Sequence, residues 1–154
     1  MLTKLAKEIM TSPVITVTAD TPVSKAAAIM LEESVGALVV VDSDGNYEGM
    51  LSESRYLPEE NVIPYMRRTV LRVFGTELGD PENIEEVIQE TRNKPIGEVM
   101  AKNLKTLSPD AHLAEVAKLM VDTRAHHLTV VDNNKPVGMI SRHDLLELFA
   151  AAEG

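Results

Sequence analysis

The same pattern of residues occurs twice in this chain, about 90 residues apart. Met10 matches Met100, Met30 matches Met120, and the run Val-Val-Asp that ends at Asp42 returns at Asp132. The offset then falls to 89 residues, so that Gly49 matches Gly138. A deletion of one residue inside a turn is what a duplicated unit tolerates. The repeat therefore predicts a fold built from two copies of one unit.

The first copy is predicted to form a strand, a helix, two strands and a short final helix. Extended residues 14–17 precede a helix that starts at Asp20-Thr21-Pro22 and runs to about Glu33. The continuous apolar run 37–41 is typical of a strand buried on both faces. A polar turn separates this strand from a return strand at 47–52.

The second copy is predicted to repeat that order. The elements are an extended piece at 104–107, a helix opened by Ser108-Pro109-Asp110, strands at 128–131 and 137–140 joined at Asn133-Asn134, and a last helix from Arg142 to about Ala150. A unit of this size cannot bury its apolar strands alone, but two units packed together can. The sequence thus predicts an α/β (α+β) fold of two pseudo-symmetric β-α-β-β-α repeats packed sheet to sheet.

The segment between the copies belongs to neither of them. We divide the chain into repeat 1 at 1–57, a helical insert at 58–95 and repeat 2 at 96–154. Apolar residues from Val62 to Phe74 recur at steps of three and four, which predicts an amphipathic helix, and Asp80-Pro81 is predicted to start a second helix. The insert is interpreted as a helical hairpin that caps the module or fills a dimer contact, with a specific effector site as the alternative.

Composition narrows the classes of function. The net charge of −9 and the aromatic content of 3% argue against binding to nucleic acid or to an anionic membrane surface. The chain has no cysteine, which excludes disulfides and thiolate metal sites. Its start does not resemble a signal peptide, and no run approaches the ~20 apolar residues of a membrane span. We therefore expect a cytoplasmic protein.

One short motif, at the start of the final helix of each copy, contains the candidate binding residues. Ser141 ends an apolar strand and is predicted to cap the final helix, because its hydroxyl can accept a hydrogen bond from an unpaired amide of the first turn. Asp144 lies in that first turn, beside the positive end of the helix. The first copy keeps the serine as Ser52 but has Arg55 where the second has Asp144.

These features resemble the tandem CBS-domain pair, also called a Bateman module. The resemblance rests on the motifs at 10–17, 35–42 and 138–145 and covers both repeats but not the insert. It implies a flat pseudo-symmetric unit with two clefts, each able to hold an adenosine-containing ligand such as AMP, ADP, ATP or S-adenosylmethionine. It also implies a homodimer and an effector protein, still unknown, that reads the ligand state.

The resemblance assigns the ribose hydroxyls to the carboxylate of Asp144, which can accept from both hydroxyls of a cis-diol. The alternative for Asp144 is a carboxylate that only complements the helix dipole. Ser141 would face the ribose or the first phosphate. The implied adenosine site consists of Pro13, Val14, Ile15, Val35, Gly36, Ala37, Leu38, Met139, Ser141, Arg142, His143 and Asp144.

The second cleft departs from the family pattern. Arg55 cannot accept hydrogen bonds from ribose hydroxyls, so we expect one adenosine site, with the second cleft taking a phosphate or another anion. Its implied residues are Ser52, Arg55, Lys105, His126 and His127. The two adjacent histidines are read either as phosphate contacts that strengthen as they become charged or as surface residues without a ligand.

The predicted function is a regulatory module that senses an adenosine-containing ligand and transmits its presence by a conformational or dimer rearrangement. A dimerisation scaffold without a ligand is the alternative. An enzyme is less favoured, because the chain lacks a cysteine nucleophile, a nucleophile elbow and a glycine-rich phosphate loop. Adjacent histidines rarely converge on one ion, so no metal site is expected.

Overall fold

The computed structural model describes residues 3–52, 72–73, 76–77 and 84–151. The first half contains β1 (Thr16–Thr18), α2 (Val23–Glu33), β2 (Ala37–Val41) and β3 (Tyr47–Ser52). The final short helix expected for this half lies outside the described residues. Helix α2 buries Val23, Ala26 and Met30, at the spacing of three and four that places them on one face.

The second half follows the same order, which confirms the predicted fold class. It contains α4 (Leu113–Thr123), β7 (His127–Asp132), β8 (Lys135–Ser141) and α5 (Arg142–Ala151). In place of a full counterpart of β1, Leu107 alone forms a parallel bridge with Val130. Asn133 and Asn134 both have positive φ, as a two-residue hairpin turn with the twist of its strands requires.

The two main helices begin later than predicted. Pro22 is the N-cap of α2 instead of its first residue, and His112 is the N-cap of α4. Residues 108–111 form a turn, in which the Ala111 amide donates to the Ser108 carbonyl at 3.0 Å. The Ala111 carbonyl accepts from Ala6 and the Leu113 amide donates to Lys4, so pairing with the start of the chain keeps this stretch out of the helix.

Each sheet is completed by a segment from the start of the other copy. The first sheet has the order β1-β2-β3-β6, where β6 (Ala101–Lys102) pairs with Gly49 and Met50 of β3. In the second sheet, Thr11 occupies the corresponding edge and pairs with Met139 of β8. The two copies therefore exchange their edge segments.

The hydrophobic cores show the same exchange. Ile96 of η4 (Ile96–Glu98) is fully buried in the core beneath β2 and β3, together with Leu38 and Leu51. Ala6 of α1 (Ala6–Ile9) is fully buried in the core beneath β7 and β8. Each core therefore includes a buried residue from the leading segment of the other half.

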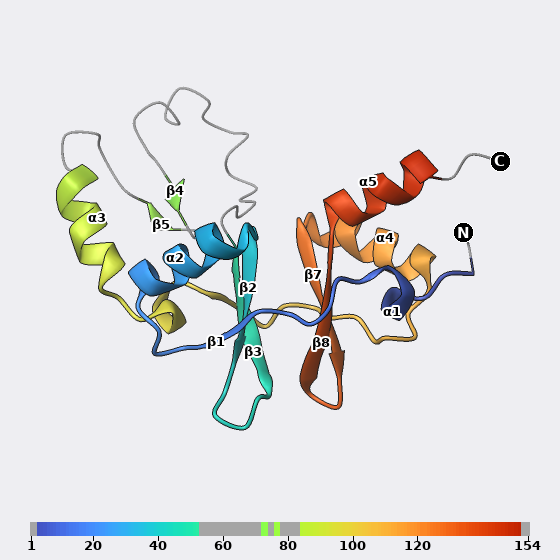
Figure 1. The fold of residues 1–154 in the computed structure, drawn as a ribbon, viewed down its shortest axis with the longest axis horizontal. Helices are drawn as coiled ribbons and strands as arrows, with labels where there is room; N and C mark the ends of the chain where they lie inside the picture. Colours follow the sequence, from blue (N-terminus) through green and yellow to red (C-terminus); the bar gives the residue numbers. More distant parts are fainter. Residues whose placement is uncertain (1–2, 53–71, 74–75, 78–83, 152–154) are drawn as a thin grey trace.

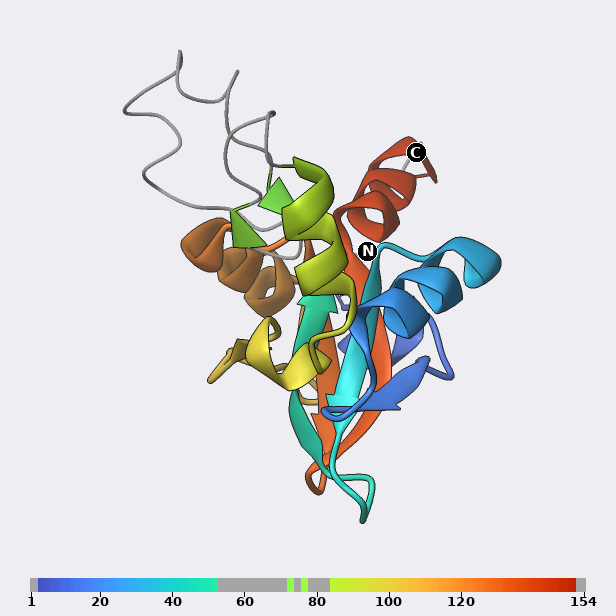
Figure 2. The ribbon, with the colours of Figure 1, turned by 90° about the vertical axis from the view of Figure 1, so that its left-hand side faces the viewer.

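The halves stand side by side, with the strands of both in the middle of the molecule and α2 and α4 farther out (Figure 1). The chain starts at α1 beside the second half and then crosses to β1 in the first. Seen from the side of the first half, the two sheets lie one behind the other (Figure 2).

The insert is only partly described. The second predicted helix is confirmed as α3 (Ile84–Arg92). The predicted amphipathic helix is wrong at its C-terminal end, because β4 (Arg72–Val73) pairs antiparallel with β5 (Thr76–Glu77). The apolar periodicity therefore does not decide the local structure at 72–73 and 76–77. The rest of that prediction lies outside the described residues.

The two hairpin tips meet at the end of the molecule. The Tyr47 amide donates to the Asn134 carbonyl at 2.7 Å, and Lys135 Nζ donates to the Asp44 carbonyl. Within the first tip, Asp42 Oδ1 accepts from the amides of Asn46 at 2.8 Å and Asp44 at 2.9 Å. The amide of Asn46, then that of Asp44 and the charge of Lys135, hold the pKa of Asp42 below 3.8.

Asp42→Ala is expected to remove a pH-dependent part of the stability. A lowered pKa in the folded state contributes stability above the unfolded value, and this is lost as the pH falls below 3.8 through the folded value. Thermal unfolding should therefore show a larger difference between wild type and Asp42→Ala at pH 7 than at pH 3. Asp44→Ala is the control, since the Asp44 carboxylate makes neither hydrogen bond. Parallel pH profiles of wild type and Asp42→Ala would contradict this account.

Candidate functional site

The larger of two clefts between the halves has a volume of about 560 Å³, and we call it the Asp144 cleft. One wall comes from the segment before β1 and the start of β2, the other from the end of β8 and the start of α5. Its lining residues are Thr11, Pro13, Val14, Ile15, Glu33, Ser34, Val35, Gly36, Ala37, His127, Met139, Ser141 and Asp144.

All but three of the residues predicted for the adenosine site line this cleft. Leu38 has no exposed surface and belongs to the first core, because β2 is buried on both faces. Arg142 and His143 are exposed and also do not line it. The sequence reading missed Thr11, Glu33 and Ser34. By the repeat offset, Ser34 corresponds to Arg124 of the second copy. That correspondence could have been used to predict Ser34 as a lining residue.

Ser141 and Asp144 form a reciprocal capping pair at the start of α5. The Asp144 amide donates to Ser141 Oγ at 3.2 Å, which confirms the predicted cap, and the Ser141 amide donates to Asp144 Oδ2 at 2.7 Å. Both residues are part-buried. One carboxylate oxygen is thus held by the backbone, while Oδ1 has no protein hydrogen-bond partner among the described residues.

Arg142 and His143 are engaged elsewhere. The Arg142 guanidinium donates to the carbonyls of Ala125 at 3.3 Å and Arg124 at 3.4 Å, on the loop that lines the other cleft. His143 Nε2 lies 3.2 Å from Glu147 Oε1, one helical turn along, with both side chains mostly exposed. Neither side chain therefore lines the Asp144 cleft, for which both residues were predicted.

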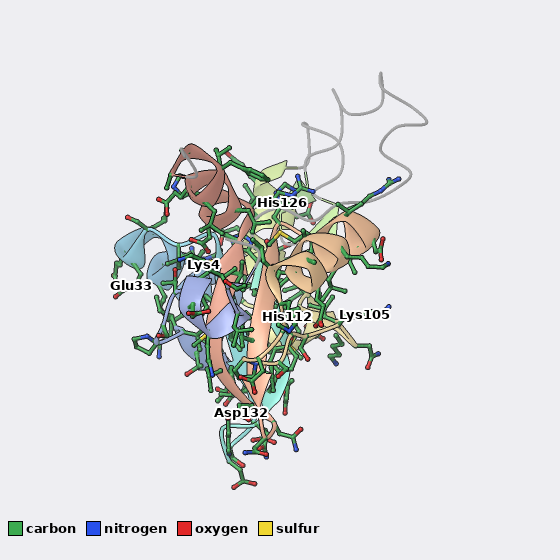
Figure 3. The ribbon with its side chains drawn as sticks, turned by 90° about the vertical axis from the view of Figure 1, so that its right-hand side faces the viewer. Lys4, Glu33, Lys105, His112, His126 and Asp132 are labelled. Carbon is green, nitrogen blue, oxygen red and sulfur yellow. The ribbon has the colours of Figure 1, made fainter. Side chains whose placement is uncertain are left out.

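The smaller cleft has a volume of about 260 Å³ and contains the equivalent elements with the copies exchanged. We call it the Lys105 cleft. Ser52, Lys105, His126 and His127 line it, whereas Arg55 lies outside the described residues. Figure 3 shows Lys105 and His126 among the side chains of the second half. Its other lining residues are Tyr47, Met50, Val99, Met100, Ala101, Lys102, Leu104, Thr123, Arg124, Ala125, Leu128 and Thr129.

The two clefts differ in side-chain size at two aligned positions. Gly36 and Ala37 in the Asp144 cleft correspond to His126 and His127 in the Lys105 cleft. The backbone is alike at both places, since Ser34 and Arg124 each end a helix in the left-handed conformation. His126 lines the Lys105 cleft, whereas His127 lines both clefts. Volumes of roughly 300–1,000 Å³ are typical of small-molecule sites. The Asp144 cleft lies within that range and the Lys105 cleft slightly below it.

Tyr47 adds a titratable group to the Lys105 cleft, where burial raises the pKa of its phenol above 10.0. The described residues include no group of three or more His, Asp or Glu side chains suited to a metal ion. In the same part of the chain, no helix is both long enough and apolar enough to cross a bilayer.

The fold is a duplicated α/β module with two clefts, in which equivalent elements of the two copies change places. The family model for the CBS domain matches residues 6–57 and 96–151, so the chain belongs to the CBS-domain family and carries two copies of the domain. A CBS domain-containing protein of Dictyostelium discoideum is 30% identical over 146 residues, which span 94% of this chain and 90% of that protein.

Solved CBS pairs share the fold. The CBS domain pair of protein MJ0100, in complex with 5′-methylthioadenosine and S-adenosyl-L-methionine, has a TM-score of 0.68 at 21% identity and covers 97% of this chain and 98% of its own. CBSX2 in complex with AMP has a TM-score of 0.66 at 19% identity and covers 96% of both chains. Such likeness establishes the architecture.

Proposed function

We propose that this protein is a non-catalytic regulatory module that binds an adenosine-containing ligand in the Asp144 cleft. The observation that carries the proposal is a part-buried carboxylate, with one oxygen held by the helix cap, at the wall of a cleft of about 560 Å³. The capping bond orients the carboxylate, and the remaining oxygen can accept from a ribose hydroxyl.

The opposite wall suits a planar base. Pro13, Val14, Ile15, Val35 and Ala37 supply apolar surface, and Val35 to Ala37 run along the edge where α2 gives way to β2. A flat heteroaromatic ring buries its faces against such side chains and hydrogen-bonds its edge to nearby backbone. AMP and S-adenosyl-L-methionine in the neighbouring CBS pairs are ligands of this kind.

The signal would pass between copies of the chain and on to an effector protein. The side chains of Leu31 and Val121, at equivalent positions of α2 and α4, are 81% and 75% exposed, and Phe149 of α5 is 75% exposed. These exposed apolar side chains, present on the outer helices of both halves, are the feature that supports a homodimer. A ligand that changes the angle between the halves would then alter the dimer. The same residues favour the dimerisation scaffold as the second candidate.

The Lys105 cleft is proposed to take a phosphate or a similar anion. Lys102, Lys105 and Arg124 line it together with two histidines. The two acidic residues of the Asp144 cleft, Glu33 and Asp144, correspond in the sequence to Thr123 and Arg55. Guanidinium and ammonium groups bind phosphate oxygens by charge-assisted hydrogen bonds.

Asp144→Asn is expected to abolish ligand-induced stabilisation. A binding ligand raises the unfolding midpoint with concentration, so wild type should respond to at least one of AMP, ADP, ATP, S-adenosylmethionine and 5′-methylthioadenosine. Loss of the ribose contact should weaken binding by roughly tenfold or more. The measurement is thermal unfolding across a ligand titration, followed by calorimetry.

Glu8→Gln provides the matched control. Glu8 caps α1 through the same bond, with the Leu5 amide donating to Oε2 at 2.7 Å, but it does not line the cleft. It should lower the unfolding midpoint and leave the ligand response intact. An unchanged response in Asp144→Asn would mean that the site is elsewhere. No response of the wild type to any of these compounds would favour the scaffold.

A further inference from the structure

The ionisable groups of the Asp144 cleft are predominantly acidic. Glu33 and Asp144 line it from opposite sides, one in the last turn of α2 and one in the first turn of α5. Figure 3 shows Glu33 at the end of α2. The described lining includes no lysine or arginine, and His127 is its one other titratable side chain.

Arg142 and His143, which follow Ser141 in the described part of α5, make contacts outside the cleft. The Arg142 guanidinium is directed by two carbonyls towards the loop of the Lys105 cleft, and His143 pairs with Glu147. The positions that carry cations in the Lys105 cleft are neutral here: Lys105 corresponds to Ile15 and Arg124 to Ser34. The two clefts therefore differ in charge. Cationic side chains line the Lys105 cleft, and carboxylates line the Asp144 cleft.

The N-terminus of α5 does not supply the positive charge that a phosphate in this cleft would need. The N-terminus of α5 would attract an anion through its amides and dipole. Asp144 is already there, accepting from the Ser141 amide and donating its own amide to Ser141 Oγ. A phosphate in this cleft would meet two carboxylates and a helix end that an acid has already capped.

We infer that the Asp144 cleft selects adenosine ligands whose 5′ substituent is neutral or cationic, such as a thioether or a sulfonium, over ligands with a 5′ phosphate. This inference rests on the proposed function, since it concerns the same cleft. The basis is Coulombic: like charges brought into one cleft repel, and the low-dielectric walls strengthen the effect. Glu33 is the residue that sets the preference without contacting the ribose.

The test compares AMP with 5′-methylthioadenosine, which differ only at the 5′ substituent, by calorimetry at low and high salt. Binding in the Asp144 cleft is the component lost in Asp144→Asn, which separates it from AMP held in the Lys105 cleft. The wild type should bind 5′-methylthioadenosine roughly tenfold more tightly than AMP in this component, and salt should reduce the ratio.

Glu33→Gln should reduce that ratio about threefold, because the side chain is exposed and partly screened. Glu32→Gln removes the same charge from a neighbouring exposed residue outside the cleft and should leave the ratio unchanged. Equal or tighter binding of AMP would overturn the inference and leave the adenosine site standing. If neither compound binds, the proposed function itself fails. If Glu33→Gln and Glu32→Gln change the affinity ratio equally, Glu33 does not set the preference.

Discussion

Gly49→Ala is expected to lower the free energy of unfolding by about 3 kcal/mol. A Cβ at this position would lie 2.4 Å from the Ala101 carbonyl oxygen, far closer than such atoms can approach. That carbonyl belongs to the backbone of β6, which pairs with Gly49 at the edge of the first sheet. The clash can be relieved only by moving the strand that the second copy contributes. Urea denaturation measures the loss.

Gly138→Ala is the matched comparison, because Gly138 occupies the equivalent position in the second copy. Its Cβ would meet the side chain of Met10, with Sδ at 2.2 Å, and a thioether chain can rotate away. The cost should be smaller than at Gly49. Met10→Ala should partly rescue Gly138→Ala, whereas Met100→Ala should not rescue Gly49→Ala. Equal losses with equal rescue would contradict the distinction between backbone and side-chain contacts.

Ile96→Ala should cost about 3 kcal/mol of unfolding free energy, in the range for a fully buried isoleucine. Ile96 has no exposed surface and lies in the core of the first half, although it belongs to the start of the second copy in sequence. The truncation leaves a cavity beneath β2 and β3. Hydrogen exchange should therefore show a larger loss of protection in β2 and β3 than in β7 and β8.

The control is Ile88→Ala on α3, where the side chain is 44% exposed. That change should cost less than about 1 kcal/mol. A loss at Ile96 no larger than at Ile88 would show that the exchanged segment does not stabilise the first half.

Much of the cleft could be predicted from residues alone. The resemblance to a CBS-domain pair, which rests on the duplicated motifs, implied that Ser141 faces Pro13 to Ile15 and Val35 to Ala37, and all of these line one cleft. Arg142 and His143 could not be placed this way, because neighbours on a helix point in different directions and their partners are set by the fold. Leu38 failed for a related reason, since a strand buried on both faces directs alternate residues away from the cleft.

The sequence by itself determined the duplication, the order of helices and strands, and the capped start of α5. These follow from periodicity, turn residues and capping, which act over a few residues. Only the tertiary structure decided that each copy completes the other's sheet and core, through β6 and Ile96 in one direction and Thr11 and Ala6 in the other. Either sheet edge satisfies the same backbone donors and acceptors, so local pattern cannot choose between them. Long-range packing makes that choice. It thereby also brings the cationic side chains together in one cleft and the carboxylates in the other.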